Sequence, residues 1–148
     1  MLDLLYNDVG ATMLSPAHLA QPQCRPLRIL IVEDNPDAAG SLAMLLRLDK
    51  HEVEIALDGR TALQKAALQE PDVVLLDIGL PGMDGFEVAK GLKALPPDKQ
   101  PFIVAITGFG ADEYRNRSVQ AGIEFYFVKP IDPELLLSLL RRLAQACC

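Results

Sequence analysis

The sequence predicts an α/β fold in which a five-stranded parallel sheet has the flavodoxin-like, doubly wound (βα)5 topology. Short apolar runs alternate with segments of helical periodicity five times along the chain, which is the pattern of βαβ crossovers. Most of these runs are continuously apolar, as expected of strands that helices cover on both faces. The second run alternates charged and apolar residues, as expected at a sheet edge, and this favours the strand order 2-1-3-4-5.

The expected strands are the five apolar runs at Ile29–Val32, Glu52–Leu57, Val73–Leu76, Phe102–Ile106 and Phe125–Val128. Each run is followed by residues that predict a helix, around Leu42 and Leu46, around Ala62 and Ala66, around Phe86 and Leu92, from about Ala111 to Ala121, and around Leu135 and Leu143.

Three helix starts carry their own signals. Asn35-Pro36 and Asp132-Pro133 each offer an N-cap residue followed by a proline at the first helical position. Asp84 stands three residues before Glu87, which is the spacing of a capping box. These signals place helix starts directly after the first, third and fifth strands, which supports the alternating pattern.

The length of 148 residues fits one domain, which we place at residues 27–146. Residues 1–26 show no sustained period and are interpreted as an N-terminal tail or linker remnant. The net charge of −6 argues against nucleic-acid contact by this chain. No apolar run approaches the ~18 residues of a membrane span, and the first residues lack a basic leader region. Cys24, Cys147 and Cys148 have no metal-ligand spacing and favour reduced thiols, so we expect a cytoplasmic protein without membrane contact.

Polar side chains stand directly after four of the five expected strands. Glu33 and Asp34 follow the first strand, Asp77 the third, Thr107 the fourth and Lys129 the fifth. Because the carboxyl ends of parallel strands meet at one edge of a sheet, these residues are expected to converge there. Taken singly, each would be an ordinary surface or strand-end residue. Their shared position at strand ends instead indicates a functional rim.

The chemistry of this rim indicates a hard cation and an anion. Three carboxylates brought together repel one another, and a bound cation relieves that repulsion. Oxygen ligands without His or Cys favour Mg²⁺. Lys129 supplies a positive charge for an anion, and Thr107 offers a hydroxyl beside Gly108, whose backbone N–H is open to approach.

Four segments form a joint signature: Ile-Leu-Ile-Val-Glu33-Asp34, Leu-Leu-Asp77-Ile-Gly-Leu-Pro81-Gly-Met83-Asp-Gly85, Ile106-Thr107-Gly108 and Tyr126-Phe-Val-Lys129-Pro130. Together they resemble the receiver domain of two-component response regulators, over roughly residues 27–144. Any one segment alone would be weak, whereas the four in this order are specific.

The resemblance implies that Asp77 is the phosphoacceptor, which takes a phosphoryl group from a phosphohistidine on a histidine kinase or phosphotransfer protein. It implies that Asp34, Asp77 and the backbone carbonyl of Gly79 hold Mg²⁺, with Glu33 reaching the metal directly or through water. It also implies that Lys129 pairs with the phosphoryl group. These roles agree with phosphoryl-transfer chemistry, in which positioning and charge neutralisation supply most of the catalysis.

The resemblance further implies a conformational switch. Thr107 and the backbone of Gly108 would contact the phosphoryl group, Tyr126 would change rotamer behind Thr107, and the bond from Lys129 to Pro130 would be cis. The signal would leave through the face built from the fourth helix, fifth strand and fifth helix to a downstream protein, with a homodimer as an open alternative.

Some residues depart from the usual family pattern or have no assigned role. Gly79 supplies no side chain beside Asp77, and Gly108 replaces a more usual alanine. Phe109 is hypothesised to shield the acyl phosphate and lengthen its life. His18 and His51 are interpreted as surface residues, and Arg115 and Arg117 as a solvated helix face.

We expect a phosphoacceptor signalling domain that is not an enzyme beyond catalysing its own phosphorylation and dephosphorylation. The alternative is a receiver module from a hybrid sensor histidine kinase or other multidomain regulator, which passes phosphate onward; the linker-like residues 1–26 support it. A nucleotide- or flavin-binding protein is disfavoured, because Glu33-Asp34-Asn35 stands where a Gly-rich phosphate loop would follow the first strand.

Overall fold

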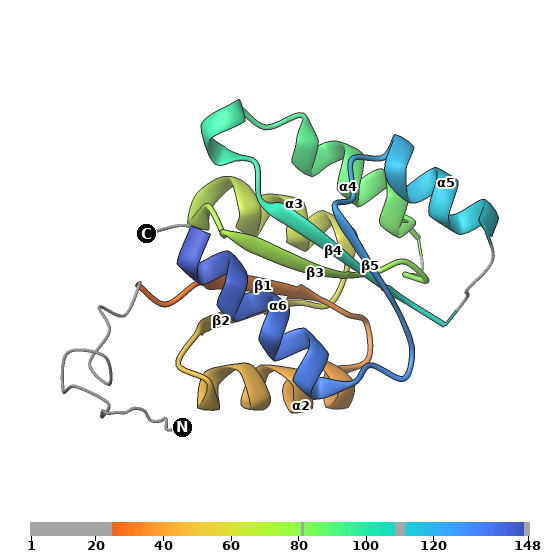
Figure 1. Ribbon diagram of the computed structural model, residues 1–148. Coiled ribbons are helices and arrows are strands. Elements are labelled where there is room, and N and C mark those ends of the chain that lie inside the picture. The colour runs from red at the N-terminus through yellow and green to blue at the C-terminus, as the bar shows by residue number, and fades with distance from the viewer. Residues whose placement is uncertain (1–24, 81, 109–111, 147–148) are drawn as a thin grey trace, which may run out of the picture.

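A computed structural model describes residues 25–80, 82–108 and 112–146 of the chain (Figure 1). Strands and helices alternate in the expected order: β1 (Arg28–Val32), α2 (Pro36–Leu48), β2 (Glu52–Ala56), α3 (Gly59–Gln69), β3 (Val73–Asp77), α4 (Gly85–Lys93), the 3-10 turn η2 (Pro97–Lys99), β4 (Phe102–Thr107), α5 (Asp112–Gln120), β5 (Phe125–Val128) and α6 (Pro133–Ala146). Residues 1–24, Pro81, Phe109 and the three cysteines lie outside the described residues, as does the side chain of Arg115.

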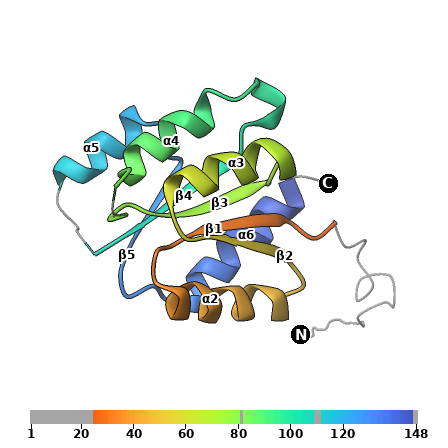
Figure 2. The same cartoon turned by 180° about the vertical axis from the view of Figure 1, so that it is seen from behind.

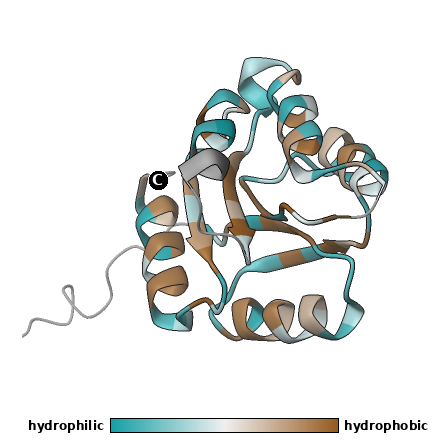
Figure 3. Cartoon of the chain, turned by 90° about the vertical axis from the view of Figure 1, so that its right-hand side faces the viewer, coloured by the Kyte–Doolittle hydropathy of each residue, from teal (hydrophilic) through white to brown (hydrophobic). Residues whose placement is uncertain are grey.

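The sheet is parallel throughout and has the order β2-β1-β3-β4-β5, which confirms the predicted topology. Helices cover both of its faces. α2 and α6 lie on one side, while α3, α4 and α5 lie on the other (Figures 1 and 2). The strands are largely apolar, and the helices carry polar residues between their apolar ones (Figure 3). Within the described residues, no helix is long and apolar enough to cross a membrane.

Two hydrophobic clusters fill the layers between sheet and helices. On the α2–α6 side, alternate residues of the central strands, such as Ile31 and Leu75, pack with Leu46 and Leu140. On the other side, the remaining strand residues pack against α3 and α4 through groups such as Phe86. Because β1, β3 and β4 are buried on both faces, their side chains are apolar except at strand ends, where Arg28, Asp77 and Thr107 stand, as expected of central parallel strands.

β2 forms one edge of the sheet, as its alternating sequence predicted. Two backbone carbonyls of this strand accept hydrogen bonds from side chains of the flanking helices. The Arg47 guanidinium of α2 donates to the Val53 carbonyl at 2.8 Å, and the Lys65 ammonium of α3 donates to the Ile55 carbonyl at 2.6 Å. Exposed edge carbonyls invite pairing with another strand, so these two cations protect the edge.

The predicted helix caps are present. The Asn35 side chain accepts hydrogen bonds from two backbone N–H groups in the first turn of α2, and Asp84 with Glu87 forms a complete capping box at the start of α4. Asp132 accepts the Glu134 N–H at the start of α6. These caps matter for function, because each fixes a helix that begins just after a strand end on the same edge of the sheet.

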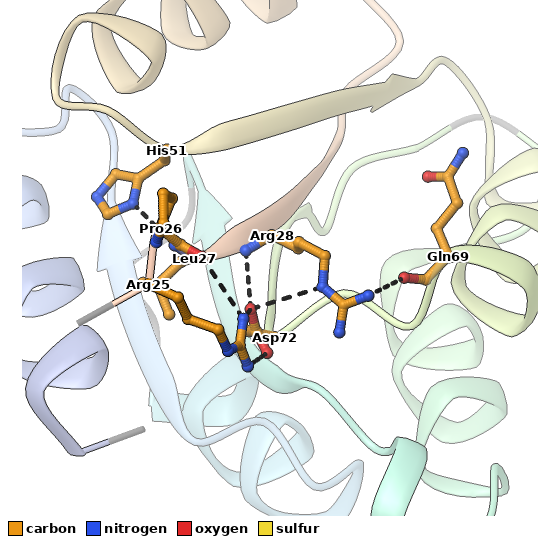
Figure 4. Close-up of polar contacts among 7 residues, drawn as sticks. All are labelled: Arg25, Pro26, Leu27, Arg28, His51, Gln69 and Asp72. Carbon is orange, nitrogen blue, oxygen red and sulfur yellow. Dashed lines mark hydrogen bonds and ion pairs between the residues drawn. The ribbon is translucent and has the colours of Figure 1, made fainter. Parts of the chain in front are cut away.

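Asp72 directly precedes β3, at the amino ends of the strands, and it anchors the start of the described chain (Figure 4). Its carboxylate accepts two 2.7 Å hydrogen bonds from the Arg25 guanidinium and one of 2.8 Å from the Arg28 N–H. Arg28 also donates to the Gln69 carbonyl at 3.0 Å. Arg25 therefore contacts the folded unit, although it precedes the predicted domain start at residue 27.

The interpretation of His51 as a surface residue is wrong. Its side chain is only 6% exposed, and its Nδ1 accepts a hydrogen bond from the Leu27 N–H at 3.3 Å (Figure 4). Its Nε2 lies 3.6 Å from an Asp49 carboxylate oxygen. Burial lowers the pKa of His51 below its usual range, which outweighs the opposite effect of Asp49. The polar sequence around this turn gave no sign that the folded chain would bury the imidazole beside Leu27 and Asp49.

Candidate functional site

The residues predicted to form a rim lie at the carboxyl edge of the sheet. β3 ends at Asp77 and β4 ends at Thr107, while Glu33 and Lys129 each follow directly after a strand. The sheet register holds these strand ends beside one another, because Asp77 pairs with Ile106 and Thr107 pairs with Val128. Four separate parts of the sequence thus contribute to one site.

Three carboxylates gather at the centre of this rim. Glu33, Asp34 and Asp77 each offer an oxygen atom, and the three oxygens lie within 4.8 Å of one another. Glu33 and Asp77 are largely buried and Asp34 is exposed. An oxygen-only donor set of this size matches the preference of Mg²⁺, which takes one or two carboxylates and keeps several waters. The cluster therefore has the chemistry of a divalent-cation site.

Lys129 brings the positive charge of the site. Its Nζ lies 3.5 Å from Glu33 Oε1 and 3.6 Å from Asp77 Oδ2, and its side chain is 43% exposed. Its backbone N–H donates to the Thr107 carbonyl at 2.7 Å, and its peptide bond to Pro130 is cis, as the resemblance implied. The ammonium thus lies between two carboxylates and faces solvent, where an incoming anion could reach it.

The electrostatics of the rim show strong mutual influence. Burial raises the pKa of Glu33; the hydrogen bond from the Asn35 N–H and the charge of Lys129 oppose this, while Asp34 and Asp77 add to it. Burial would lower the pKa of Lys129, but the charges of Asp77 and Glu33 outweigh it and raise that pKa. Lys129 is therefore a permanent cation at neutral pH, beside carboxylates that a further cation would stabilise.

The loop after Asp77 is closely connected to its carboxylate. The Gly79 N–H donates to Asp77 Oδ1 at 3.0 Å, which holds the side chain at the rim. The Gly85 N–H donates to the Ile78 carbonyl at 3.1 Å, and this bond joins the start of α4 to the residue that follows Asp77. A Cβ on Gly85 would lie 2.6 Å from the Ile78 Cα, so only glycine allows this approach.

The predicted phosphoryl and switch residues lie beside this centre. Thr107 is buried, at 1% exposure, and Gly108 is exposed, with no atom within 4 Å of the position that a Cβ would take. Tyr126 is half-buried and packs against the core cluster on the α3–α4 side. Since Tyr126 pairs with Ala105 and Val128 pairs with Thr107, Tyr126 and Thr107 project from the same face of the sheet.

The sequence gave no sign of a cavity of about 630 Å³ that opens at the same rim. Glu33, Asp77 and Lys129 line its polar end, and apolar residues such as Leu42 and Ile131 line the rest. The cavity lies between α2 and the segment that leads into α6. An apolar wall thus adjoins the carboxylates and contributes to the burial that raises the pKa of Glu33.

Arg117 is exposed, as predicted for a solvated helix face, and it also makes two contacts with α4. Its guanidinium carbon lies 4.1 Å from the centre of the Phe86 ring, and its Nη2 lies 3.7 Å from Asp84 Oδ2. The side chain is 48% exposed, so solvation and contact coexist. Periodicity could not reveal this contact, because it joins two helices that come together only in the folded chain.

Comparison with known sequences identifies relatives of this arrangement. Residues 29–141 match the family described as response regulator receiver domain. The chain is 37% identical over 118 residues to the response regulator PleD of Caulobacter vibrioides, a match that covers 80% of this chain and 26% of PleD. It is 36% identical over 120 residues to the response regulator MprA of Mycolicibacterium vanbaalenii, covering 81% of this chain and 51% of MprA. The match thus spans about a quarter of the length of PleD and about half of the length of MprA.

Solved structures agree with the sequence matches. The chemotaxis protein CheY4 of Vibrio cholerae superposes with a TM-score of 0.75 at 32% identity, covering 80% of this chain and 98% of that one. The receiver domain of the sensor histidine kinase PA1611 from Pseudomonas aeruginosa superposes with a TM-score of 0.73 at 30% identity, covering 81% and 98%. That structure holds a magnesium ion coordinated in its active site cleft.

Proposed function

Because the chain belongs to the response regulator receiver domain family, we propose that it accepts a phosphoryl group on Asp77 from a phosphohistidine of a histidine kinase or phosphotransfer protein. An Asp77 carboxylate oxygen forms the new bond to phosphorus, and the bond from phosphorus to the histidine nitrogen breaks. The leaving imidazole keeps the electron pair and takes up a proton from solvent. The product is an acyl phosphate on Asp77.

The observation that carries this proposal is the convergence of Glu33, Asp34, Asp77 and Lys129 at one strand edge. Phosphoryl transfer depends mainly on positioning and on stabilising negative charge. Lys129 is placed to pair with a phosphoryl oxygen once Asp77 is modified. The hydrogen bond from Gly79 orients the Asp77 carboxylate for attack.

The carboxylate cluster fits Mg²⁺ through its all-oxygen donor set. Asp34, Asp77 and the Gly79 carbonyl would hold the ion, with Glu33 binding directly or through water. The bound ion would neutralise the charge that builds up on the phosphoryl oxygens.

The roles proposed for Thr107, Gly108 and Tyr126 in a conformational switch follow from their positions on β4 and β5 and just after β4. The Thr107 hydroxyl and the Gly108 N–H would bind phosphoryl oxygens, and Tyr126 would change rotamer as Thr107 moves. The surface formed by α5, β5 and α6 would then present the signal to a downstream protein, with a homodimer as the other use of this face. Phe109 keeps its proposed role in shielding the acyl phosphate, as a hypothesis about a residue outside the described part of the chain.

The signalling domain is assigned to residues 27–146 of a cytoplasmic protein, with residues 1–26 as a tail or linker. A second candidate function is a receiver module within a hybrid histidine kinase that passes phosphate onward. The likeness to the receiver domain of the sensor kinase PA1611 favours keeping this alternative. Nothing in the geometry of the site distinguishes the two uses, because both begin with phosphorylation of Asp77.

The decisive experiment is incubation with Mg²⁺ and acetyl phosphate, followed by intact mass measurement. Wild type should gain one phosphoryl group and Asp77→Asn should gain none. Asp37→Asn, which removes a carboxylate from the exposed start of α2, is the matched control and should gain one. If wild type stays unmodified and also fails to bind beryllofluoride, the proposed function is wrong.

A further inference from the structure

The second half of α5, residues 116–120, buries little apolar surface. Its sequence is polar, and of the side chains described in it, at residues 116–120, only Ser118 is buried. Val119 is 74% exposed. Residues with so little buried apolar surface gain little from hydrophobic packing, so individual polar contacts have a large influence on the position of this half of the helix.

Arg117 makes two contacts with the start of α4. Its guanidinium lies over the Phe86 ring, at 4.1 Å from the ring centre, and 3.7 Å from the Asp84 carboxylate. Phe86 is 4% exposed and belongs to the core cluster on this side of the sheet. The cation therefore connects the exposed second half of α5 to a buried residue of the core through two favourable interactions.

The two partners of Arg117 lie at the start of α4, which is tied to the proposed phosphoacceptor. Asp84 caps α4, and the next residue, Gly85, donates its N–H to the carbonyl of Ile78. Ile78 directly follows Asp77. A continuous path of contacts thus runs from Asp77 through the start of α4 to Arg117 and α5.

We propose that Arg117 is a positioning residue for the phosphorylation switch. Its contacts with Phe86 and Asp84 hold α5 in the resting position, and they are given up when Asp77 carries a phosphoryl group. The inference rests on the proposed function, because it assigns the switch to phosphorylation of Asp77. A contact made in only one of two conformations shifts their equilibrium by its own free energy. Loss of Arg117 should therefore favour the phosphorylated conformation.

The test is the dissociation constant of beryllofluoride, an analogue of the phosphoryl group, measured by titration calorimetry in saturating Mg²⁺. Arg117→Gln should bind it about fivefold more tightly than wild type, since a cation–π contact and an exposed ion pair are removed from the resting state. Arg117→Lys keeps the charge without the planar guanidinium and should fall between the two. Arg142→Gln, which removes an exposed arginine of α6, is the charge-matched control and should bind as wild type does.

Two further measurements separate this role from a general effect of charge or stability. The Mg²⁺ affinity without beryllofluoride should be the same in wild type and Arg117→Gln. Amide hydrogen exchange across residues 112–120 should be faster in Arg117→Gln than in wild type. Asp84→Asn retains an N-cap side chain while removing the charge, so Asp84→Asn and Arg117→Gln should be less than additive in their effects on beryllofluoride affinity.

An Arg117→Gln variant with unchanged or weaker beryllofluoride affinity would overturn this inference and leave the proposed function intact. Equal tightening in Arg142→Gln would also overturn it, because the effect would then come from net charge. If wild type itself binds no beryllofluoride, the proposed function fails first and this inference fails with it.

Discussion

The Lys129 ammonium lies 3.6 Å from the Asp77 carboxylate, at a site where two further carboxylates also converge. The ion pair has two consequences. It offsets part of the repulsion among the acidic groups, and it places a cation where phosphoryl oxygens would arrive. In the proposed function the same side chain would both compete with a metal ion for the carboxylates and assist phosphoryl transfer to Asp77.

Replacing Lys129 with methionine should separate these two effects. Mg²⁺ should bind more tightly, because a competing cation is removed from the carboxylates. Phosphorylation by acetyl phosphate should slow by ~100-fold, because charge stabilisation in the transition state is lost. Calorimetry and time-resolved intact mass would measure the two quantities. Lys90→Met, on the exposed side of α4, is the control, and an equal loss of rate in both variants would contradict the role of Lys129.

The double variant Arg47→Ala with Lys65→Ala removes both side chains that donate hydrogen bonds to the β2 carbonyls. It should promote self-association through β2. The Val53 and Ile55 carbonyls would then lack their side-chain donors and could pair with another strand. Light scattering and size-exclusion chromatography at rising protein concentration would detect the change. Arg60→Ala with Arg142→Ala removes the same charge elsewhere and should remain like wild type. Association in both double variants would point to lost charge as the cause.

The fold and the rim could be predicted because their signals are local. Apolar runs mark the central strands, the alternation in Glu52–Ala56 marks the edge, and short polar motifs mark the strand ends. Parallel topology then brings Asp77 and Lys129 together without further information.

Contacts between side chains of different elements could not be predicted in this way. Arg117 reaches Phe86, and His51 becomes buried, only through the packing of helices on the sheet. A polar residue in a polar segment gives no periodic signal of burial. The cavity beside Asp77 depends on the distance between α2 and the segment that leads into α6, which sequence spacing does not encode.

His51 should make stability depend on pH in the mildly acidic range. Its pKa is lowered in the folded chain, so the unfolded chain binds the proton more readily. Stability is therefore fully present above the ordinary histidine pKa of about 6.5 and is lost as pH falls below it, by at most ~1.4 kcal/mol per pH unit. Protonation of Nδ1 would also remove the acceptor of the Leu27 N–H.

Urea denaturation between pH 5 and pH 7.5 would measure this loss in wild type. His51→Gln should be less stable than wild type at pH 7.5, because the hydrogen bond from the Leu27 N–H to His51 Nδ1 is lost or weakened. Its stability should nevertheless change less with pH. The nearby charges of Asp49 and Arg141 remain in both proteins. A pH dependence that is the same in both proteins would assign it to other groups.

Two glycines should respond to alanine in opposite directions. Gly40 lies within α2, and a Cβ there would meet no atom within 4 Å, so Gly40→Ala should raise the free energy of unfolding by about 0.5–1 kcal/mol through lower chain entropy. Gly85→Ala would place its Cβ 2.6 Å from the Ile78 Cα and 3.0 Å from the Asp77 carbonyl oxygen. Backbone atoms cannot yield as a flexible side chain can, so the free energy of unfolding of this variant should fall by about 1–3 kcal/mol.

Gly85→Ala should also accept a phosphoryl group from acetyl phosphate more slowly, because the loop after Asp77 must shift, whereas Gly40→Ala should keep the wild-type rate. Urea denaturation and intact mass on the same samples would test both effects, and a Gly85→Ala protein with wild-type stability and rate would show that the close approach at Ile78 is not required.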